Sequence, residues 1–119
     1  MARILYADDN ADLRRSFSRA AERLDHKIVA VDDAARAWEL LDKGEQFDLI
    51  ISDFDMPEMN GGDFLRKVKA DPRTAKIPFA LISGHDDQDF VDTVTDMGAR
   101  FYSKAKLSIY DMIPQMLAG

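Results

Sequence analysis

Polar side chains that could hold a metal ion and a phosphoryl group follow four short apolar runs of the sequence. Asp8 and Asp9 come directly after the first run, and Asp53 closes the second. Ser83 and Lys104 end two later runs. If the four runs are neighbouring parallel strands, these side chains converge on one edge of a sheet, where open α/β folds bind their ligands. The sequence therefore predicts a single site built from these five residues.

The chemistry of that site follows from its donor groups. Three crowded carboxylates repel one another and need a counter-charge, and oxygen donors without His or Cys favour Mg²⁺. We interpret Asp9, with Asp8 behind it, as the metal-holding pair, and Asp53 as a nucleophile that forms an acyl phosphate. Lys104 would pair with Asp53 or with the phosphoryl oxygens. Ser83 would donate a hydrogen bond to those oxygens.

Strand-like and helix-like patterns alternate along the chain and would position these residues. Near-continuous apolar strands between one-sided helices indicate a parallel sheet covered on both faces and joined by right-handed crossovers, the α/β class. We expect strands at 4–7, 28–31, 48–53, 79–82 and 99–103. We expect helices at 13–24, 34–41, 64–68, 90–97 and 109–117.

Composition limits the classes of function that are open to the chain. With 119 residues, 46% of them hydrophobic and 32% charged, we expect one soluble domain over 1–119 with no output domain attached. No apolar stretch approaches the roughly 20 residues of a membrane helix, and no signal-peptide layout precedes the first strand, so we expect a cytoplasmic protein. The chain has no cysteine. A net charge of −6 without a basic stripe argues against direct nucleic-acid binding.

Taken together, the motifs resemble the receiver domain of two-component response regulators. They are the Asp8–Asp9 pair, the segment Asp53–Gly61 with the sequence DFDMPEMNG, and then Ser83 and Lys104, in that order and spacing. The resemblance covers the whole chain. It implies a five-stranded, doubly wound, flavodoxin-like sheet with strand order 2-1-3-4-5 and five helices.

The same resemblance implies a function and a set of roles. Asp53 would accept a phosphoryl group from a phosphohistidine on a sensor histidine kinase or phosphotransfer protein. Mg²⁺ would lie among Asp8, Asp9, Asp53 and the backbone carbonyl of Asp55. The protein would catalyse its own phosphorylation and dephosphorylation and turn over no metabolite.

Two further residues match the switch positions of that family. The hydroxyl of Ser83 would swing toward the phosphoryl group, and the ring of Phe101, three residues before Lys104, would change between outward and inward packing. The surface expected to change is formed by the fourth helix, the fifth strand and the fifth helix. We expect a downstream target protein to bind there.

The chain departs from the commonest family pattern after the lysine, where Ala105 replaces a proline that usually follows a cis peptide bond. The loop therefore either keeps a costly cis bond or runs trans and aims Lys104 differently. Asp55, two residues after the acceptor, and His85, two residues after Ser83, lie where the family tunes the lifetime of the phosphoryl group.

Two other interpretations of the function stay open at this stage, and one further acidic pair needs an assignment. A degenerate receiver would bind partners without phosphorylation, with Ala105 and Asp55 as its marks. A haloacid dehalogenase-type phosphatase would use the Asp-x-Asp motif of Asp53 and Asp55, but that motif is expected on the first strand, and the chain lacks the later acidic motif and a cap. The pair Asp32–Asp33 is interpreted as a helix cap rather than as a second site.

Overall fold

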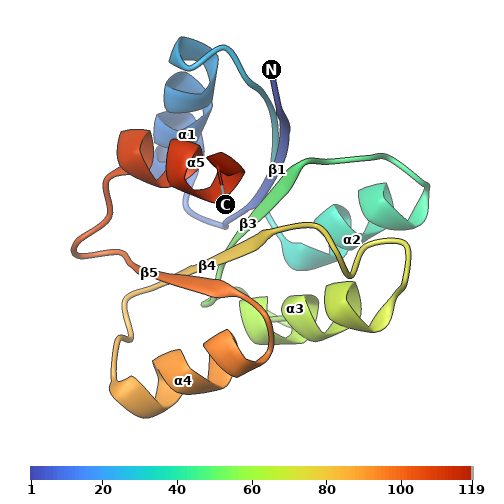
Figure 1. Ribbon diagram of the computed structural model, residues 1–119, viewed down its shortest axis with the longest axis vertical. Coiled ribbons are helices and arrows are strands. Elements are labelled where there is room, and N and C mark those ends of the chain that lie inside the picture. The colour runs from blue at the N-terminus through green and yellow to red at the C-terminus, as the bar shows by residue number, and fades with distance from the viewer. Residues whose placement is uncertain (119) are drawn as a thin grey trace.

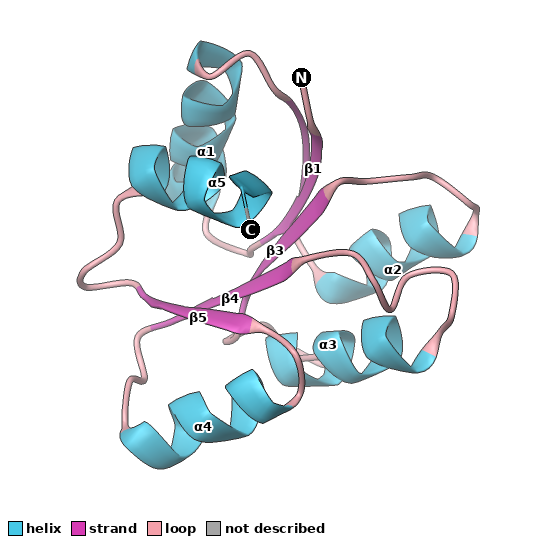
Figure 2. Cartoon of the chain, viewed as in Figure 1, coloured by secondary structure: helices cyan, strands magenta, loops and turns pink. Residues whose placement is uncertain are grey.

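Strands and helices alternate strictly through residues 1–118, which the computed structural model describes (Figure 2). The strands are β1 (Arg3–Ala7), β2 (Lys27–Val31), β3 (Leu49–Asp53), β4 (Phe79–Ser83) and β5 (Arg100–Ser103). The helices are α1 (Ala11–Arg23), α2 (Ala34–Asp42), α3 (Gly61–Ala70), α4 (Gln88–Asp96) and α5 (Ile109–Ala118). The ten elements are those expected from the sequence.

The strands form one parallel sheet in the order β2-β1-β3-β4-β5, which confirms the predicted topology. The register pairs Ala7 of β1 with Ser52 of β3, and Asp53 of β3 with Ile82 of β4. The carboxyl ends of these strands therefore finish level with one another, so residues that follow them meet at one edge of the sheet.

Helices cover both faces of the sheet, with α1 and α5 on one face and α2, α3 and α4 on the other (Figure 1). Side chains alternate between these faces along each strand. In β1, Ile4 and Tyr6 pack in the cluster under α1 and α5, whereas Leu5 and Ala7 pack in the cluster under the other three helices. Burial on both faces explains why the strands are apolar runs rather than alternating patterns.

Polar side chains begin the helices by accepting a backbone hydrogen bond from the first turn. Asp33 accepts from the N–H of Arg36, so the predicted cap at Asp32–Asp33 is confirmed. At the carboxyl end of α4, the N–H of Ala99 donates to the carbonyl of Val94. Ala99 therefore belongs to the end of the helix, and β5 begins at Arg100, one residue later than expected. None of the helices in residues 1–118 combines the length and the apolar surface needed to cross a lipid bilayer.

Gly61 lets the first turn of α3 pack directly against the end of β3. A Cβ at this position would lie 2.4 Å from the carbonyl oxygen of Asp53 and 2.7 Å from a methyl carbon of Leu81. The N–H of Gly61 donates to the carbonyl of Phe54 at 2.8 Å. Backbone atoms surround the position, so a side chain there cannot be accommodated by rotating a neighbour.

We expect the substitution Gly61→Ala to lower the free energy of unfolding by about 1–3 kcal/mol, because α3 must move away from β3 to admit a methyl group. Urea denaturation measures the change. Gly84→Ala is the matched control, since no atom lies within 4 Å of a Cβ built there, and its effect should be small. Equal stability of the two variants would contradict the close packing of α3 on β3.

Candidate functional site

Three carboxylates gather at the carboxyl edge of the sheet. Oxygen atoms of Asp8, Asp9 and Asp53 all lie within 4.8 Å of one another. Asp8 and Asp53 are fully buried, whereas Asp9 faces solvent. The structure therefore brings together the three acidic residues singled out from the sequence, because β1 and β3 are hydrogen-bonded neighbours.

Asp8 is held in place by groups that the sequence analysis did not assign to the site. The hydroxyl of Tyr6 donates to one carboxylate oxygen of Asp8, and the N–H of Asn10 donates to the other at 2.9 Å. Arg14 donates to the backbone carbonyl of Asp8 at 2.7 Å. Burial, and then the contact with Asp8, raises the pKa of Tyr6 far above its ordinary value, so the phenol keeps its proton and stays a donor.

Asp53 faces the ammonium group of Lys104. The Nζ atom of Lys104 lies 2.8 Å from Oδ1 of Asp53, and Asp53 is only 1% exposed. Burial raises the pKa of Asp53 to about 6, although the contact with Lys104 opposes this shift and the charge on Asp8 adds to it. Burial alone would lower the pKa of Lys104, but the bond to Asp53 and the negative charges of Asp53, Asp8 and Asp55 together raise that pKa.

The donor set at this edge suits a divalent cation. Apart from the ion pair with Lys104, the buried Oδ1 of Asp53 has no hydrogen-bond partner in the described part of the chain. Three carboxylates face one ammonium group, which leaves negative charge uncompensated. Asp8, Asp9 and Asp53 therefore fit Mg²⁺, which prefers carboxylate oxygens. The contribution of the Asp55 carbonyl stays a prediction.

Lys104 reaches Asp53 without a cis peptide bond. Every peptide bond in residues 1–118 is trans, including the bond that precedes Ala105. The backbone N–H of Lys104 donates to the carbonyl of Ser83 at 2.9 Å, which extends the pairing of β4 with β5 by one residue. This bond fixes the start of the Lys104 side chain beside the site.

Ser83 and Phe101 lie on β4 and β5, the strands that follow β3 across the sheet. By the alternation of side chains, Phe101 is on the face opposite to Asp53. Ser83 is buried at the end of β4, and its hydroxyl oxygen accepts the N–H of His85 at 3.0 Å. Phe101 pairs with Leu81 across the two strands and is half-buried against the cluster under α2, α3 and α4. The hydroxyl hydrogen of Ser83 stays available for donation.

Asp55 and His85 form the mouth of the site. Their side chains are 58% and 66% exposed, and Nε2 of His85 lies 3.8 Å from Oδ2 of Asp55. A contact so open to solvent contributes little to stability. The tuning role of Asp55 and His85 stays a prediction.

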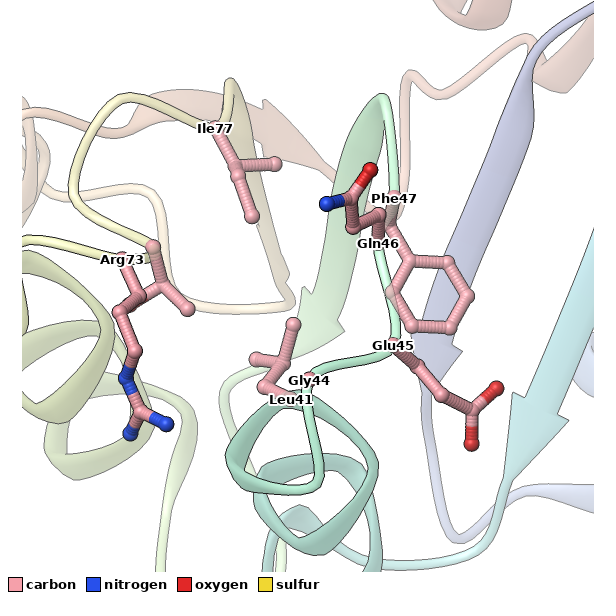
Figure 3. A pocket seen from close by; sticks show the side chains of 8 residues that line it. Leu41, Gly44, Glu45, Gln46, Phe47, Arg73 and Ile77 are labelled. Carbon is pink, nitrogen blue, oxygen red and sulfur yellow. The ribbon is translucent and has the colours of Figure 1, made fainter.

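A cavity of about 370 Å³ lies at the opposite edge of the sheet, between the loops before β3 and β4 (Figure 3). Its charged groups are already paired: Arg73 binds Asp42 and Asp71, and Glu45 binds Arg3. The charged side chains that line this cavity are therefore paired within residues 1–118, whereas the carboxylates at the carboxyl edge outnumber their ammonium partner.

Comparisons with known proteins agree with this architecture. A family model for the response regulator receiver domain matches residues 4–106. Chemotaxis protein CheY1 of Helicobacter pylori is 33% identical over 101 residues, which cover 84% of this chain and 82% of that protein. Two-component response regulator ORR13 of rice, Oryza sativa subsp. japonica, is 32% identical over 114 residues, covering 96% and 93%.

Solved structures show the same fold. Chemotaxis response regulator CheY4 of Vibrio cholerae superposes with a TM-score of 0.89 at 22% identity, covering 98% of this chain and 99% of that one. A signal receiver domain of a histidine kinase from Syntrophus aciditrophicus gives a TM-score of 0.87 at 26% identity, covering 100% and 92%.

We expect Asp53→Asn to raise the free energy of unfolding of the metal-free protein at pH 7 by roughly 2–3 kcal/mol. The folded-state pKa of about 6 exceeds the ordinary value of 3.8, so protonation of Asp53 favours folding. That stabilisation is complete below about pH 3.8 and is lost as the pH rises through about 6. The advantage of the variant should therefore vanish near pH 4. Urea denaturation between pH 4 and pH 8 measures it.

The exposed Asp55 provides the control, because Asp55→Asn should change stability little at any of these pH values. A variant at Asp53 that is less stable than the parent at pH 7 would show that Lys104 fully compensates the buried charge.

Proposed function

Because this chain belongs to the family of response regulator receiver domains, we propose that it is a phosphorylation switch of two-component signalling, with Asp53 as its phosphoacceptor. The observation that carries the proposal is the buried carboxylate of Asp53, which is paired with Lys104 and lies beside two further carboxylates. Burial of a carboxylate among like charges is costly, which favours a functional role for Asp53.

In the proposed reaction, an oxygen of Asp53 forms a bond to phosphorus while the bond from phosphorus to the imidazole nitrogen of the donor breaks. The electron pair of that bond stays on the imidazole. Lys104 lies next to Oδ1 of Asp53, so its charge can pair with the phosphoryl oxygens once the carboxylate becomes an acyl phosphate. Ser83 donates its free hydroxyl hydrogen to one of those oxygens.

The metal site completes this arrangement. Mg²⁺ held by Asp8, Asp9 and Asp53 would supply positive charge beside the phosphoryl oxygens. Tyr6 and Asn10 hold both oxygens of Asp8 in fixed directions, so the carboxylate is preorganised as a ligand.

Loss of the phosphoryl group occurs by attack of water at the open mouth of the site. Asp55 and His85 border that mouth and would tune the rate at which the phosphoryl group is hydrolysed. The protein catalyses its own phosphorylation and dephosphorylation and turns over no metabolite. It works in the cytoplasm, where a sensor histidine kinase or a phosphotransfer protein supplies the phosphoryl group.

The output surface consists of α4, β5 and α5. A cavity of about 330 Å³ on this surface is lined by residues of all three elements, among them Val91, Phe101 and Gln115. A change in the packing of Phe101 would alter its shape, and a target protein that prefers one shape would read the state of Asp53. The relatives named as chemotaxis proteins support a role of this type.

We expect Asp53→Asn to abolish labelling by acetyl phosphate, reducing uptake at least about 100-fold, because the amide cannot form an acyl phosphate. The labelled product should be acid-labile and sensitive to hydroxylamine. Asp55→Asn is the matched control: it changes a neighbouring carboxylate that is exposed, and it should keep the label. Label that persists in the Asp53 variant would place the nucleophile elsewhere.

Chelation of divalent cations should stop the same labelling reaction, and added Mg²⁺ should restore it, because the carboxylates of Asp8, Asp9 and Asp53 would otherwise repel the incoming phosphoryl group. Labelling time courses with and without chelator measure the effect. An unchanged rate in chelator would reject the metal assignment.

Beryllofluoride with Mg²⁺, a mimic of the phosphoryl group, should shift the amide signals of Ser83 and Phe101 in NMR spectra. The Asp53→Asn variant should show neither shift. A protein that labels nothing and shifts nothing would be a degenerate receiver that binds partners without phosphorylation. Steady release of phosphate from a generic phosphomonoester, lost in Asp55→Asn, would indicate a phosphatase instead.

A further inference from the structure

Three aromatic rings meet the ring of Phe90 near the carboxyl edge of the sheet. The ring centroid of Phe90 lies 4.9 Å from that of Phe54, 6.0 Å from that of Phe101 and 6.4 Å from that of His85. The ring planes meet at 80°, 85° and 67°, so each contact is edge to face. We call these four residues the aromatic hub.

Each outer ring of the hub belongs to a different part of the proposed switch. Phe54 directly follows Asp53, the proposed phosphoacceptor, and Phe101 is the proposed switch ring. The backbone N–H of His85 donates to the hydroxyl oxygen of Ser83. No ring pair joins Phe54 to Phe101 directly among the described residues. Phe90 is therefore the ring that the three aromatic contacts share.

The alternation of side chains in the strands explains why such a link is needed. Asp53 follows Leu49 and Ile51 on the face covered by α1 and α5, whereas Phe101 faces α4 on the other side of the sheet. The next residue, Phe54, packs in the cluster on the face of Phe101. The phenylalanines of the hub thus lie on the face of Phe101, and the backbone between Asp53 and Phe54 joins them to the phosphoacceptor.

The backbone holds both ends of this link. The N–H of Phe54 donates to the carbonyl of Ile82 at 2.9 Å, and its carbonyl accepts the N–H of Gly61 at 2.8 Å. Phe90 lies in the first turn of α4, where its N–H donates to Asp87 at 3.2 Å. Both ends of the contact between Phe54 and Phe90 are therefore fixed to the backbone of β3, β4 and α4.

We infer that Phe90 is a positioning residue that couples the state of Asp53 to the packing of Phe101. This inference rests on the proposed function and adds to it the side chain that transmits the change. Edge-to-face contacts depend on the ring electrons as well as on size, so an aliphatic side chain of similar volume fills the space without the same preferred geometry. The coupling should weaken while the fold persists.

The test uses the full chain with beryllofluoride and Mg²⁺. In the Phe90→Leu variant, the amide shift of Ser83 should be kept, whereas the shift of Phe101 should fall to less than about half of its value in the parent protein. A full Phe101 shift in this variant would overturn the inference. Phe90→Met serves as a second variant with a more flexible side chain and should give the same result.

The matched control is Phe64→Leu. Phe64 also packs against a phenylalanine, Phe79, with the ring centroids 5.6 Å apart. It belongs to the core cluster against which Phe54, Phe90 and Phe101 pack, and it has no part in the proposed switch chemistry. Its replacement should lower stability and leave both amide shifts in place. Loss of the Phe101 shift in the control as well would mean that general loosening, not the hub, explains the effect.

A second measurement needs no phosphoryl group, so it separates failure of this inference from failure of the proposed function. The unfolding equilibrium constants of Phe54→Leu, Phe101→Leu and the double variant should depart from multiplicativity by about threefold. In the Phe90→Leu background the departure should fall within about 1.5-fold. A departure that is absent in the parent, or unchanged without Phe90, would overturn the hub even if Asp53 is phosphorylated.

Discussion

The buried negative charge at the carboxyl edge of the sheet is the constraint on which the other features of this protein depend. Asp53 is enclosed by the ends of its neighbouring strands, next to the buried Asp8, with one ammonium group to compensate both. Such an arrangement costs stability unless a cation or a phosphoryl group changes the charge balance. The fold therefore holds a buried carboxylate whose charge is only partly balanced, and the ends of the parallel strands fix its position.

Asp53 and the proposed switch ring belong to different faces of the sheet. Asp53 alternates with Ile51, which packs under α1 and α5, whereas Phe101 packs against the cluster under α2, α3 and α4. In the proposed switch, phosphorylation beside one face would alter packing on the other. The phenylalanine after Asp53 lies where the two regions meet.

The convergence of Asp8, Asp9 and Asp53 was predictable from sequence because strand ends in a parallel sheet share one edge. The strand order came from the family resemblance, since the apolar pattern alone does not rank strands. The direction of Lys104 was open because Ala105 replaces the usual proline, and only the structure shows that a trans loop reaches Asp53.

Other contacts could not be read from the pattern, although one of them left a signal. Tyr6 lies two residues before Asp8 at the end of a strand, so their side chains share a face. The sequence pattern treats Tyr6 as one residue of an apolar run and gives its hydroxyl no role. Phe90 fits the apolar side of a helix, and its contacts with the other rings of the hub depend on the distance between α4 and the sheet.

The close contact of Gly61 with β3 leaves no room for a side chain at that junction, whereas the exposed loop 84–87 has open space around Gly84. Under the proposed function, substitutions in this loop would change the sensitivity of the switch while the position of Asp53 stays fixed, so sensitivity and chemistry would evolve separately.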